Sequence, residues 1–423
     1  MHVPQDIAET IVDPRAYAAR EPLDEAFSWL RSNAPLAKVQ PTGFDPFWAV
    51  TRHADILTVE RQNDLFHNGD RAATLTTIDA DRRTRELTGG SPHIVRTLVQ
   101  MDNPDHLAYR RLTQAAFLPQ NLRALEPRIR EIARSFVDRM IAMGGRCDFA
   151  RDIAFLYPLR VIMELMGVPE SDEPRMLKLT QEVFGASDPD LNRSGETVDA
   201  ARLVEDMQAT MAELMVYFNA ITEDRRRCPR EDISTIIANG QIDGQPIGHF
   251  EAMSYYIIVA TAGHDTTSNT TAGALWALAE NPEQFQKVKS DPALIPGFVE
   301  ESIRWETPVK HFMRSATADA EVAGQAIAKG DWMMLCYPSG NRDEAAFNEP
   351  FKFDVTRSPN RHVAFGYGAH VCLGQHLARM EMRILWEELL PRLKSVELDG
   401  VPSRWQASFV CGPKTVPIRF TLE

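Results

Sequence analysis

One ten-residue stretch constrains the fold more than any other part of the chain. It runs from Phe365 to Gly374 and reads Phe-Gly-Tyr-Gly-Ala-His-Val-Cys-Leu-Gly. The residues that follow, Gln375 to Met382, have helical periodicity and good helix formers. Cys372 therefore lies at the end of a glycine-rich loop, just before a helix N-terminus. Unpaired backbone N–H groups and the helix dipole favour a thiolate there, which predicts a metal ligand or a nucleophile.

A structural cysteine in an ordinary turn is the simpler interpretation of this stretch. Against it, the pattern F-G-x-G-x-H-x-C-x-G fixes six residue types within ten positions. For residue types each used at about 5%, a chance match in a chain this long is roughly one in a hundred thousand. Gly366 and Gly368 allow backbone angles that other residues avoid, so we expect the loop to press flat against something large.

This stretch resembles the haem-ligand loop of the cytochrome P-450 family. The resemblance implies that Cys372 is the axial thiolate of a b-type haem, with Gly374 among the cofactor-binding residues. A thiolate ligand pushes electron density onto iron and favours O–O cleavage. His370 matches a family position that donates a hydrogen bond to a haem propionate.

The composition is that of an ordinary globular protein. Apolar residues make up 44% and charged residues 25% of the 423 residues, a length that alone would allow two or three domains. No internal repeat, low-complexity tract or linker divides the chain. With the resemblance, the expected fold is a single, triangular haem-thiolate domain over residues 1–423, mainly α-helical with a small β region.

Charge and cysteine usage exclude several classes of protein. A net charge of −13 argues against nucleic acid and against an anionic membrane surface. Five widely spaced cysteines make no C-x-x-C pair and no disulfide framework, which fits a reducing cytoplasm. The stretch from Met1 to Arg20 has no apolar run long enough for a signal peptide or a membrane anchor, so a soluble, cytoplasmic protein is expected.

The N-terminal third predicts mixed structure before a long helical region. A short helix is expected over Leu23–Arg31, and strands over Leu36–Val39 and Phe47–Thr51. The polar stretch Asn68–Pro92 is predicted to be a surface loop, whereas Leu122–Arg227 is mostly helical in pattern.

A further helix is predicted to begin near Asp102 and Pro104 and to end at Phe117, with Asp102 as its cap. His106 and Arg110 are four residues apart on it and therefore share a face. A solvated basic face is the plain interpretation. In the family, this pattern on this helix donates to a haem propionate.

The longest periodic stretch, Ile247 to Glu280, would span about 50 Å as one helix. Its centre carries Gly263, followed by His264, Asp265 and Thr266, which suggests a locally opened helix with a ligand against it. The alternative is a helix kink with a capped threonine hydroxyl. The family carries an acid–alcohol pair here beside the place where oxygen binds, and Asp265 and Thr266 match it. His264 is a departure, because many relatives have an apolar residue there.

Glu301 and Arg304 lie three residues apart and predict an ion pair on one helix face. An exposed pair of this kind is common and contributes little to stability. The family instead buries the pair and adds a downstream arginine, which here is Arg357. The resemblance implies that these three residues brace the cysteine loop and take no part in the chemistry.

The resemblance also assigns the remaining pocket residues. Arg314 matches a propionate partner, and Val309, His311 and Phe312 are expected to face the haem pocket. Ile258 and Ala262 are expected to line the substrate pocket with Val309 and Phe312. The loop 186–190 is either a plain connection or the cover of the substrate entrance.

The match extends over nearly the whole chain and is closest to the soluble bacterial branch, in particular to its α-terpineol-hydroxylating members. It implies a monooxygenase that inserts one atom of O2 into a small apolar substrate, a terpenoid or an aromatic hydrocarbon. Electrons would come from NAD(P)H through a separate reductase and a separate iron–sulfur ferredoxin, since the chain carries no such module. The alternatives are a haem-thiolate peroxygenase or rearrangement enzyme, and a non-catalytic haem-binding protein.

Overall fold

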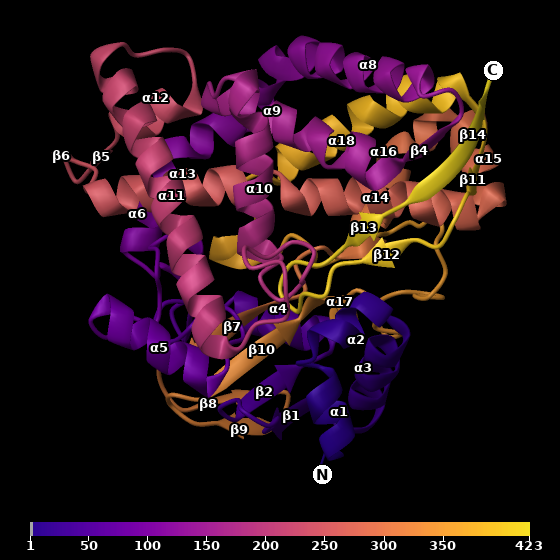
Figure 1. Cartoon of the computed structure of the whole chain (residues 1–423). Coiled ribbons are helices and arrows are strands. Elements are labelled where there is room, and N and C mark those ends of the chain that lie inside the picture. Colours follow the sequence, from indigo (N-terminus) through magenta and orange to yellow (C-terminus); the bar gives the residue numbers. More distant parts are fainter. Residues whose placement is uncertain (1–2) are drawn as a thin grey trace.

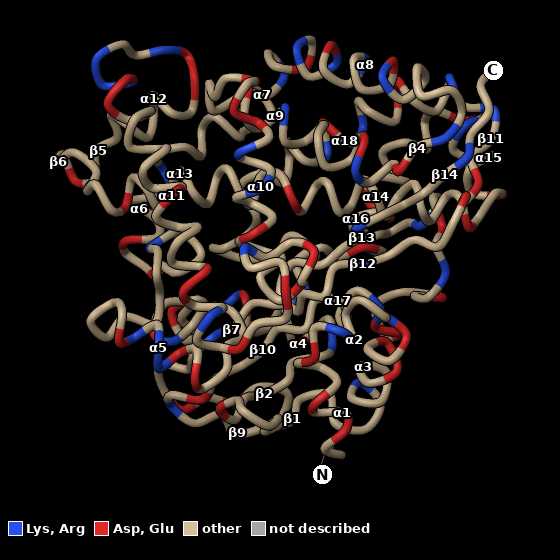
Figure 2. Tube along the Cα trace, viewed as in Figure 1, with Lys and Arg blue, Asp and Glu red and all other residues tan. Residues whose placement is uncertain are grey.

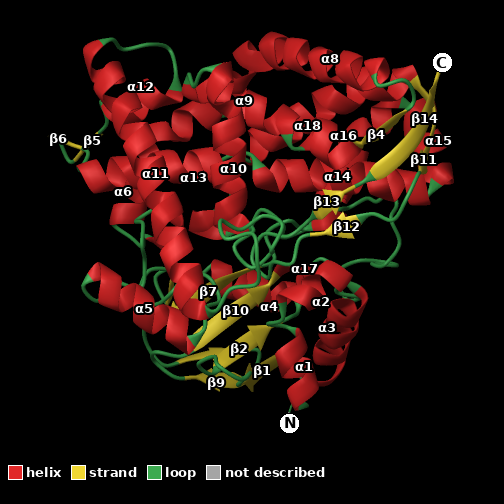
Figure 3. Ribbon diagram, viewed as in Figure 1, coloured by secondary structure: helices red, strands yellow, loops and turns green. Residues whose placement is uncertain are grey.

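The computed structural model describes residues 3–423, which form a helix-rich body with a smaller strand region on the side of the N-terminus (Figures 1 and 3). The α-helices are α1 (Gln5–Thr10), α2 (Pro14–Ala19), α3 (Glu21–Asn33), α4 (His53–Glu60), α5 (Ile78–Thr88), α6 (Asp105–Gln114), α7 (Pro119–Leu122), α8 (Glu126–Ala142), α9 (Leu156–Met166), α10 (Glu173–Phe184), α11 (Ala200–Arg227), α12 (Ile233–Ala238), α13 (His249–Ala262), α14 (Asp265–Glu280), α15 (Pro282–Ser290), α16 (Ile295–Glu306), α17 (Tyr337–Gly340) and α18 (Gln375–Leu389). The strands are β1 (Leu36–Val39), β2 (Phe47–Val50), β3 (Phe66–His67), β4 (Arg146–Asp148), β5 (Gln241–Ile242), β6 (Gln245–Pro246), β7 (His311–Ala316), β8 (Ala320–Val322), β9 (Gln325–Ile327), β10 (Trp332–Cys336), β11 (Leu393–Leu398), β12 (Ser403–Arg404), β13 (Pro413–Thr415) and β14 (Pro417–Leu422).

The largest sheet joins segments that are far apart in the sequence. Its strand order is β1-β2-β10-β7-β3, in which β10 runs parallel to β2 and every other pair is antiparallel. In the register of β10 with β7, Arg314 lies opposite Met333. The small sheet β11-β14-β4 ties the C-terminus to the segment after α8.

The expected elements near the N-terminus are confirmed. Helix α3 covers the predicted helix and buries Leu23, Ala26, Phe27 and Leu30, which recur at the spacing of one helix face. The two predicted strands are β1 and β2, which pair antiparallel. One cluster of buried apolar side chains extends from this region to the C-terminal strand β14.

The prediction of a surface loop over residues 68–92 was wrong in its centre, where α5 forms. The Thr77 side chain accepts a hydrogen bond from the Ala80 amide at 3.2 Å and caps the helix N-terminus. Gly89 ends the helix in the left-handed conformation, with φ of 70°. The helix is charged on nearly all sides, so its apolar periodicity is weak and only its caps mark it.

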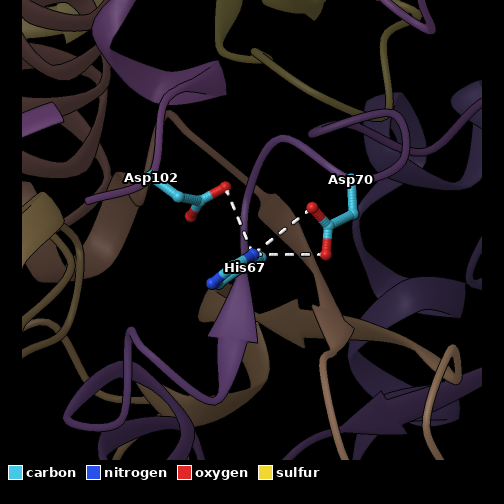
Figure 4. A group of neighbouring side chains, drawn as sticks. All are labelled: His67, Asp70 and Asp102. Carbon is cyan, nitrogen blue, oxygen red and sulfur yellow. Dashed lines mark hydrogen bonds and ion pairs between the residues drawn. The ribbon is translucent and has the colours of Figure 1, made fainter. Parts of the chain in front are cut away.

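The prediction that Asp102 caps the following helix was also wrong. Its carboxylate accepts hydrogen bonds from the amides of Asn68 and Gly69, each at 2.8 Å, while α6 begins after Pro104 without a side-chain cap. Figure 4 shows Asp102 close to His67, whose Nδ1 also lies 3.2 Å from Asp70. The Asp102 oxygens are used by backbone amides, so this cluster fastens β3 to the start of α6.

The long periodic stretch forms two helices, and the expected opening lies between them. Helix α13 ends at Ala262 and α14 begins at Asp265, with Gly263 and His264 at the break. A side chain at Gly263 would lie 2.8 Å from both Ile162 and the Val259 carbonyl oxygen, so only glycine fits. Helix α14 packs against α9, α16 and α18 and occupies the centre of the helical body.

Two further features bear on the class of protein. Within residues 3–423 every cysteine is a free thiol, as the spacing predicted. No helix in this part of the chain is both long and apolar enough to cross a membrane.

Candidate active site: an internal cavity that reaches Cys372

A large cavity lies between the α13–α14 break and the cysteine loop. It encloses about 1450 Å³ of space not filled by protein atoms, part of it open to solvent. One group of lining residues comes from α13 and α14, and another from the loop 364–374 and the start of α18. Of the described cysteines, Cys372 alone lines this cavity.

The surroundings of Cys372 are those expected for a ligand at a helix N-terminus. Its amide donates to the Phe365 carbonyl at 2.9 Å, which folds the loop back on itself before α18. Burial raises the pKa of the Cys372 thiol, while the amides of Gly374 and Gln375 and the guanidinium of Arg110 oppose that rise. A thiol that coordinates a metal is deprotonated. A metal cation bound to the sulfur would therefore stabilise the Cys372 thiolate.

The two central glycines of the loop are needed for a reason that the sequence did not reveal. Gly366 and Gly368 have φ of 65° and 71°, in the left-handed region that favours glycine. A side chain at Gly366 would lie 3.1 Å from the carboxylate of Glu60, and one at Gly368 would collide with the Glu60 carbonyl oxygen. These glycines therefore let the loop pack against the end of α4.

One edge of the cavity carries more basic than acidic side chains. Arg110 donates to the Val371 carbonyl at 2.7 Å and forms no ion pair within the described part of the chain. The rings of His106 and His370 are 4.0 Å apart, and Nε2 of His106 is buried without a hydrogen-bond partner. Burial lowers the pKa of His106 to about 4 and that of His370 to about 2, helped by the nearby arginines. This edge is suited to bind anionic groups.

Sequence reasoning missed Glu60 and Tyr337, which also line the cavity at this edge. Glu60 Oε1 accepts a hydrogen bond from the Tyr337 hydroxyl at 2.7 Å and lies 3.5 Å from Arg314 Nη2, while Oε2 has no partner. Burial raises the pKa of Glu60 to about 7, and Arg314 and Tyr337 oppose that rise. No local pattern marks this glutamate, because its partners are more than 250 residues away.

The acid and the alcohol of the expected pair point to different places. Thr266 lines the cavity, and its hydroxyl donates to the Ala262 carbonyl at 2.9 Å. Asp265 is fully buried and does not line the cavity; His264 Nδ1 lies 3.3 Å from its Oδ1. A 3.6-residue period turns adjacent side chains about 100° apart, which separates the two.

The apolar wall contains the four residues named from the resemblance, Ile258, Ala262, Val309 and Phe312, together with Leu98 and Val99. The expectation that His311 faces the pocket was wrong. Its Nε2 accepts from the Leu75 amide and its Nδ1 donates to the Ser408 carbonyl, both at 2.9 Å. Successive side chains of β7 alternate between faces, so Phe312 and Arg314 line the cavity and His311 does not.

The ion pair of α16 is buried, and a further arginine extends it. Arg304 donates to Glu301 at 2.7 and 2.8 Å, and Arg357 donates to Glu301 at 3.0 Å. Arg304 also binds the Asn341 carbonyl at 2.9 Å, while the Asn341 side chain accepts from the Val363 amide at 2.7 Å. The cluster therefore reaches the segment that leads into the cysteine loop.

The loop 186–190 is held by a buried ion pair. Asp188 is fully buried, and Lys414 of β13 donates to its two oxygens at 3.0 and 3.1 Å. The Gln406 amide donates to the same carboxylate at 2.9 Å. The segment between α10 and α11 is thereby fastened to the C-terminal strands.

Comparison with known proteins identifies this architecture. A family model described as Cytochrome P450 matches residues 75–419. The chain therefore belongs to the cytochrome P450 family of haem-thiolate monooxygenases, and the expected fold is confirmed. Members of the family carry haem b on a thiolate and use O2, an organic substrate and redox partners.

Particular relatives are similar over nearly their full length. Cytochrome P450-terp of a Pseudomonas species is 49% identical, with 99% of this chain and 98% of the relative covered. Linalool 8-monooxygenase of Pseudomonas putida is 32% identical, with 96% and 97% covered. The crystal structure of CYP108D1 from Novosphingobium aromaticivorans has a TM-score of 0.92 at 45% identity and covers 100% of this chain and 99% of that one.

The residues around the cavity fit haem b. A thiol with amide groups directed at its sulfur lies at one wall, and a basic edge with an unpaired arginine and an orphaned imidazole nitrogen suits two propionates. The rest of the lining is largely apolar, as a porphyrin face requires.

Proposed function

We propose that this monooxygenase hydroxylates a small apolar substrate, a terpenoid in preference to an aromatic hydrocarbon. The apolar lining by Ile258, Ala262, Val309 and Phe312 supports a substrate that is recognised by shape and apolar contact. The identities to cytochrome P450-terp and to a linalool 8-monooxygenase favour the terpenoid.

In this proposal Cys372 is the axial ligand of the haem iron, with Gly374 beside it. His106, Arg110, Arg314 and His370 hold the two propionates through charge-assisted hydrogen bonds. When bound, the haem supplies the electron-transfer and oxygen-insertion chemistry. Its ligand loop is braced by Glu301, Arg304 and Arg357, in one haem domain that comprises the whole chain.

Asp265 and Thr266, the first two residues of α14, serve the delivery of protons. Thr266 presents a hydroxyl to the cavity whose hydrogen is already donated to Ala262, so its oxygen is free to accept a hydrogen bond. Asp265 lies one residue away, outside the cavity lining, and relays protons from solvent. General acid assistance of this kind contributes about 10²–10⁴-fold in rate.

Electrons come from NAD(P)H through a reductase and a ferredoxin that are separate chains. Such a partner docks where its path to Cys372 is shortest, on the face near the start of α18. A peroxygenase or a rearrangement enzyme is the alternative, and it would form product without an electron donor. A non-catalytic haem-binding protein would form none under either condition. Strict dependence of product on NAD(P)H and both partners therefore separates the three functions.

A substrate panel tests the proposal most directly. Terpene alcohols, terpene hydrocarbons and alkylbenzenes of matched size are titrated into the ferric protein, and the visible spectrum reports displacement of water from the iron. We expect the high-spin shift to saturate at the lowest concentration with a terpenoid. Tighter saturation by an alkylbenzene would replace the terpenoid with an aromatic substrate. No shift with any compound would contradict the substrate class.

A further inference from the structure

His264 occupies the break between α13 and α14 and is fully buried. Its Nε2 lies 2.7 Å from the carbonyl oxygen of Phe155, directly before α9. Its Nδ1 lies 3.2 Å from the Thr180 hydroxyl of α10 and 3.3 Å from Asp265 Oδ1. This one side chain therefore connects the helix break to two neighbouring helices and to the buried acid.

The position of one proton follows from these contacts. A carbonyl oxygen only accepts hydrogen bonds, so Nε2 of His264 carries a hydrogen toward Phe155. In a neutral imidazole, Nδ1 would then present a lone pair toward Asp265. An ionised carboxylate 3.3 Å away would be repelled by that lone pair.

Asp265 has no other group to stabilise its charge. Neither carboxylate oxygen forms a hydrogen bond within residues 3–423, and no lysine or arginine of that range lies within ion-pair distance of it. A buried, unpaired carboxylate costs several kcal/mol. His264 Nδ1 is close enough for an ion pair if protonated, and no other basic nitrogen within residues 3–423 is that close to Asp265.

Within residues 3–423, no hydrogen bond or ion pair links His264 or Asp265 to a titratable group of a neighbouring helix. The contacts of His264 from α9 and α10 are the Phe155 carbonyl and the Thr180 hydroxyl, which is also 3.1 Å from the Leu177 carbonyl and donates there. Burial raises the pKa of Glu381 of α18, and the nearby Thr267 hydroxyl opposes that rise. One additional proton between Nδ1 and Oδ1 therefore gives both of these atoms a hydrogen-bond partner.

We propose that His264 is a positioning residue that shares one proton with Asp265 and holds this acid as half of a neutral pair. The inference rests on the proposed role of Asp265 in proton delivery. When Asp265 passes that proton toward Thr266, the pair is left with one negative charge, and a proton from solvent restores it. His264 is thus the partner that keeps a buried acid loaded.

The proton itself is measured by nitrogen NMR of the holoenzyme labelled with ¹⁵N-histidine, as the diamagnetic ferrous carbon monoxide complex. The signals that disappear in His264→Gln assign this residue. We expect both ring nitrogens of His264 to be protonated at pH 7, and Nδ1 to lose its proton in Asp265→Asn. An unprotonated Nδ1 in the native protein, or one that Asp265→Asn does not alter, would overturn the proposal.

Turnover distinguishes a positioning role from a structural one. The amide of His264→Gln can still donate to the Phe155 carbonyl, but it cannot carry the shared proton. We expect its product formation to fall about 100-fold, as in Asp265→Asn, with no further loss in the double variant. Thr180→Val, which removes only the neighbouring hydroxyl, serves as control. Wild-type turnover in a folded His264→Gln protein would contradict the positioning role.

The two measurements separate this inference from the proposed function. If Asp265 does not deliver protons, Asp265→Asn retains turnover, while the NMR still shows the shared proton and supports the pairing. If the pairing is wrong, Asp265→Asn slows turnover, but Nδ1 of His264 carries no proton.

Discussion

At the scale of single residues, the coupling of NAD(P)H consumption to product is expected to depend on the hydroxyl of Thr266. This hydroxyl is fixed by donation to the Ala262 carbonyl at 2.9 Å, and its oxygen faces the cavity. We expect Thr266→Ala to keep consuming NAD(P)H but to release hydrogen peroxide in place of hydroxylated product. Product and peroxide are measured against NAD(P)H consumed.

Thr270→Ala is the matched control for that variant. Thr270 also lines the cavity, one turn later, and donates to the Thr266 carbonyl at 2.9 Å. Thr270→Ala should leave the coupling of NAD(P)H to product close to that of the native protein. Thr266→Ser, which keeps a hydroxyl at this position, should also couple normally. Unchanged coupling in Thr266→Ala would remove Thr266 from proton delivery.

Arg314 is predicted to retain the haem. Charge-assisted hydrogen bonds contribute about 1.5–3 kcal/mol each, so Arg314→Ala should weaken haem affinity about 10- to 100-fold without changing the type of spectrum. Transfer of haem to a scavenging apoprotein measures this loss. Arg314 also lies 3.5 Å from Glu60, and the same substitution in a Glu60→Gln background tests whether it serves only that acid. Unchanged haem affinity in both backgrounds would show that Arg314 does not bind the propionates.

At the scale of single residues, the cavity residues that belong to a local motif were predictable from the sequence, whereas those that reach the cavity only through tertiary packing were not. His370 and Cys372 share one short loop, and His106 and Arg110 share one helix face, so local spacing identifies them. Glu60 reaches the same edge from a helix near the N-terminus, through packing that no local pattern records.

At the scale of elements, the segment between α10 and α11 is fastened by Asp188 and Lys414. If it covers the substrate entrance, as the family resemblance implies, its release should speed substrate exchange. Removing one partner of a buried pair costs about 3–5 kcal/mol, so Lys414→Met should raise the rates of substrate binding and release several-fold and lower the melting temperature. Stopped-flow recording of the spin-state change measures both rates.

Lys352→Met is a suitable control for this variant. Lys352 forms an exposed ion pair with Glu349 at 3.6 Å, and such pairs contribute about 0–1 kcal/mol. The double variant Asp188→Asn with Lys414→Met removes the leftover charge and should recover stability while keeping fast exchange. Exchange rates that remain native in Lys414→Met would show that the loop is only a connection.

Elements were predictable from sequence where one signal dominated. Strands β1 and β2 are short, mostly apolar runs separated by turn residues, and α3 has a clear apolar face, so these elements were found. Helix α5 has charges on nearly all sides and was missed, although Thr77 and Gly89 mark its ends. The break at Gly263 was expected because glycine and an acid are costly inside a buried helix, but its relation to α9 and α10 depends on tertiary packing.

At the scale of the whole molecule, residues of both charges are interleaved, although the net charge is −13. Figure 2 shows lysine and arginine interleaved with acidic residues along α8 and much of the outer trace. Arg111 and Arg379 flank the region of Cys372 in the chain, and we expect an acidic ferredoxin to meet them. Arg379 is already bound to Glu300 at 2.6 and 3.1 Å and stacks over Phe365. Arg111 is exposed and has no acidic partner in the part of the chain that the structure describes.

Reversing both charges should slow reduction by the ferredoxin and flatten its salt dependence. We expect Arg111→Glu to carry most of that effect, because the charge of Arg379 is already neutralised by Glu300. Lys329→Glu, an exposed charge in the turn before β10, is the control for net charge. If reduction kinetics are unaltered in the double variant, the partner docks elsewhere.

The central claim is that Cys372 ligates the haem iron, and the spectrum of the reduced carbon monoxide complex tests it most directly. Cys147→Ser is the control, because Cys147 does not line the cavity. The native protein and this control should show the absorption band near the wavelength that gives the family its name. Cys372→His should lose that band and the monooxygenase activity while still binding haem. A Cys372→His protein that retained the band would contradict the assignment.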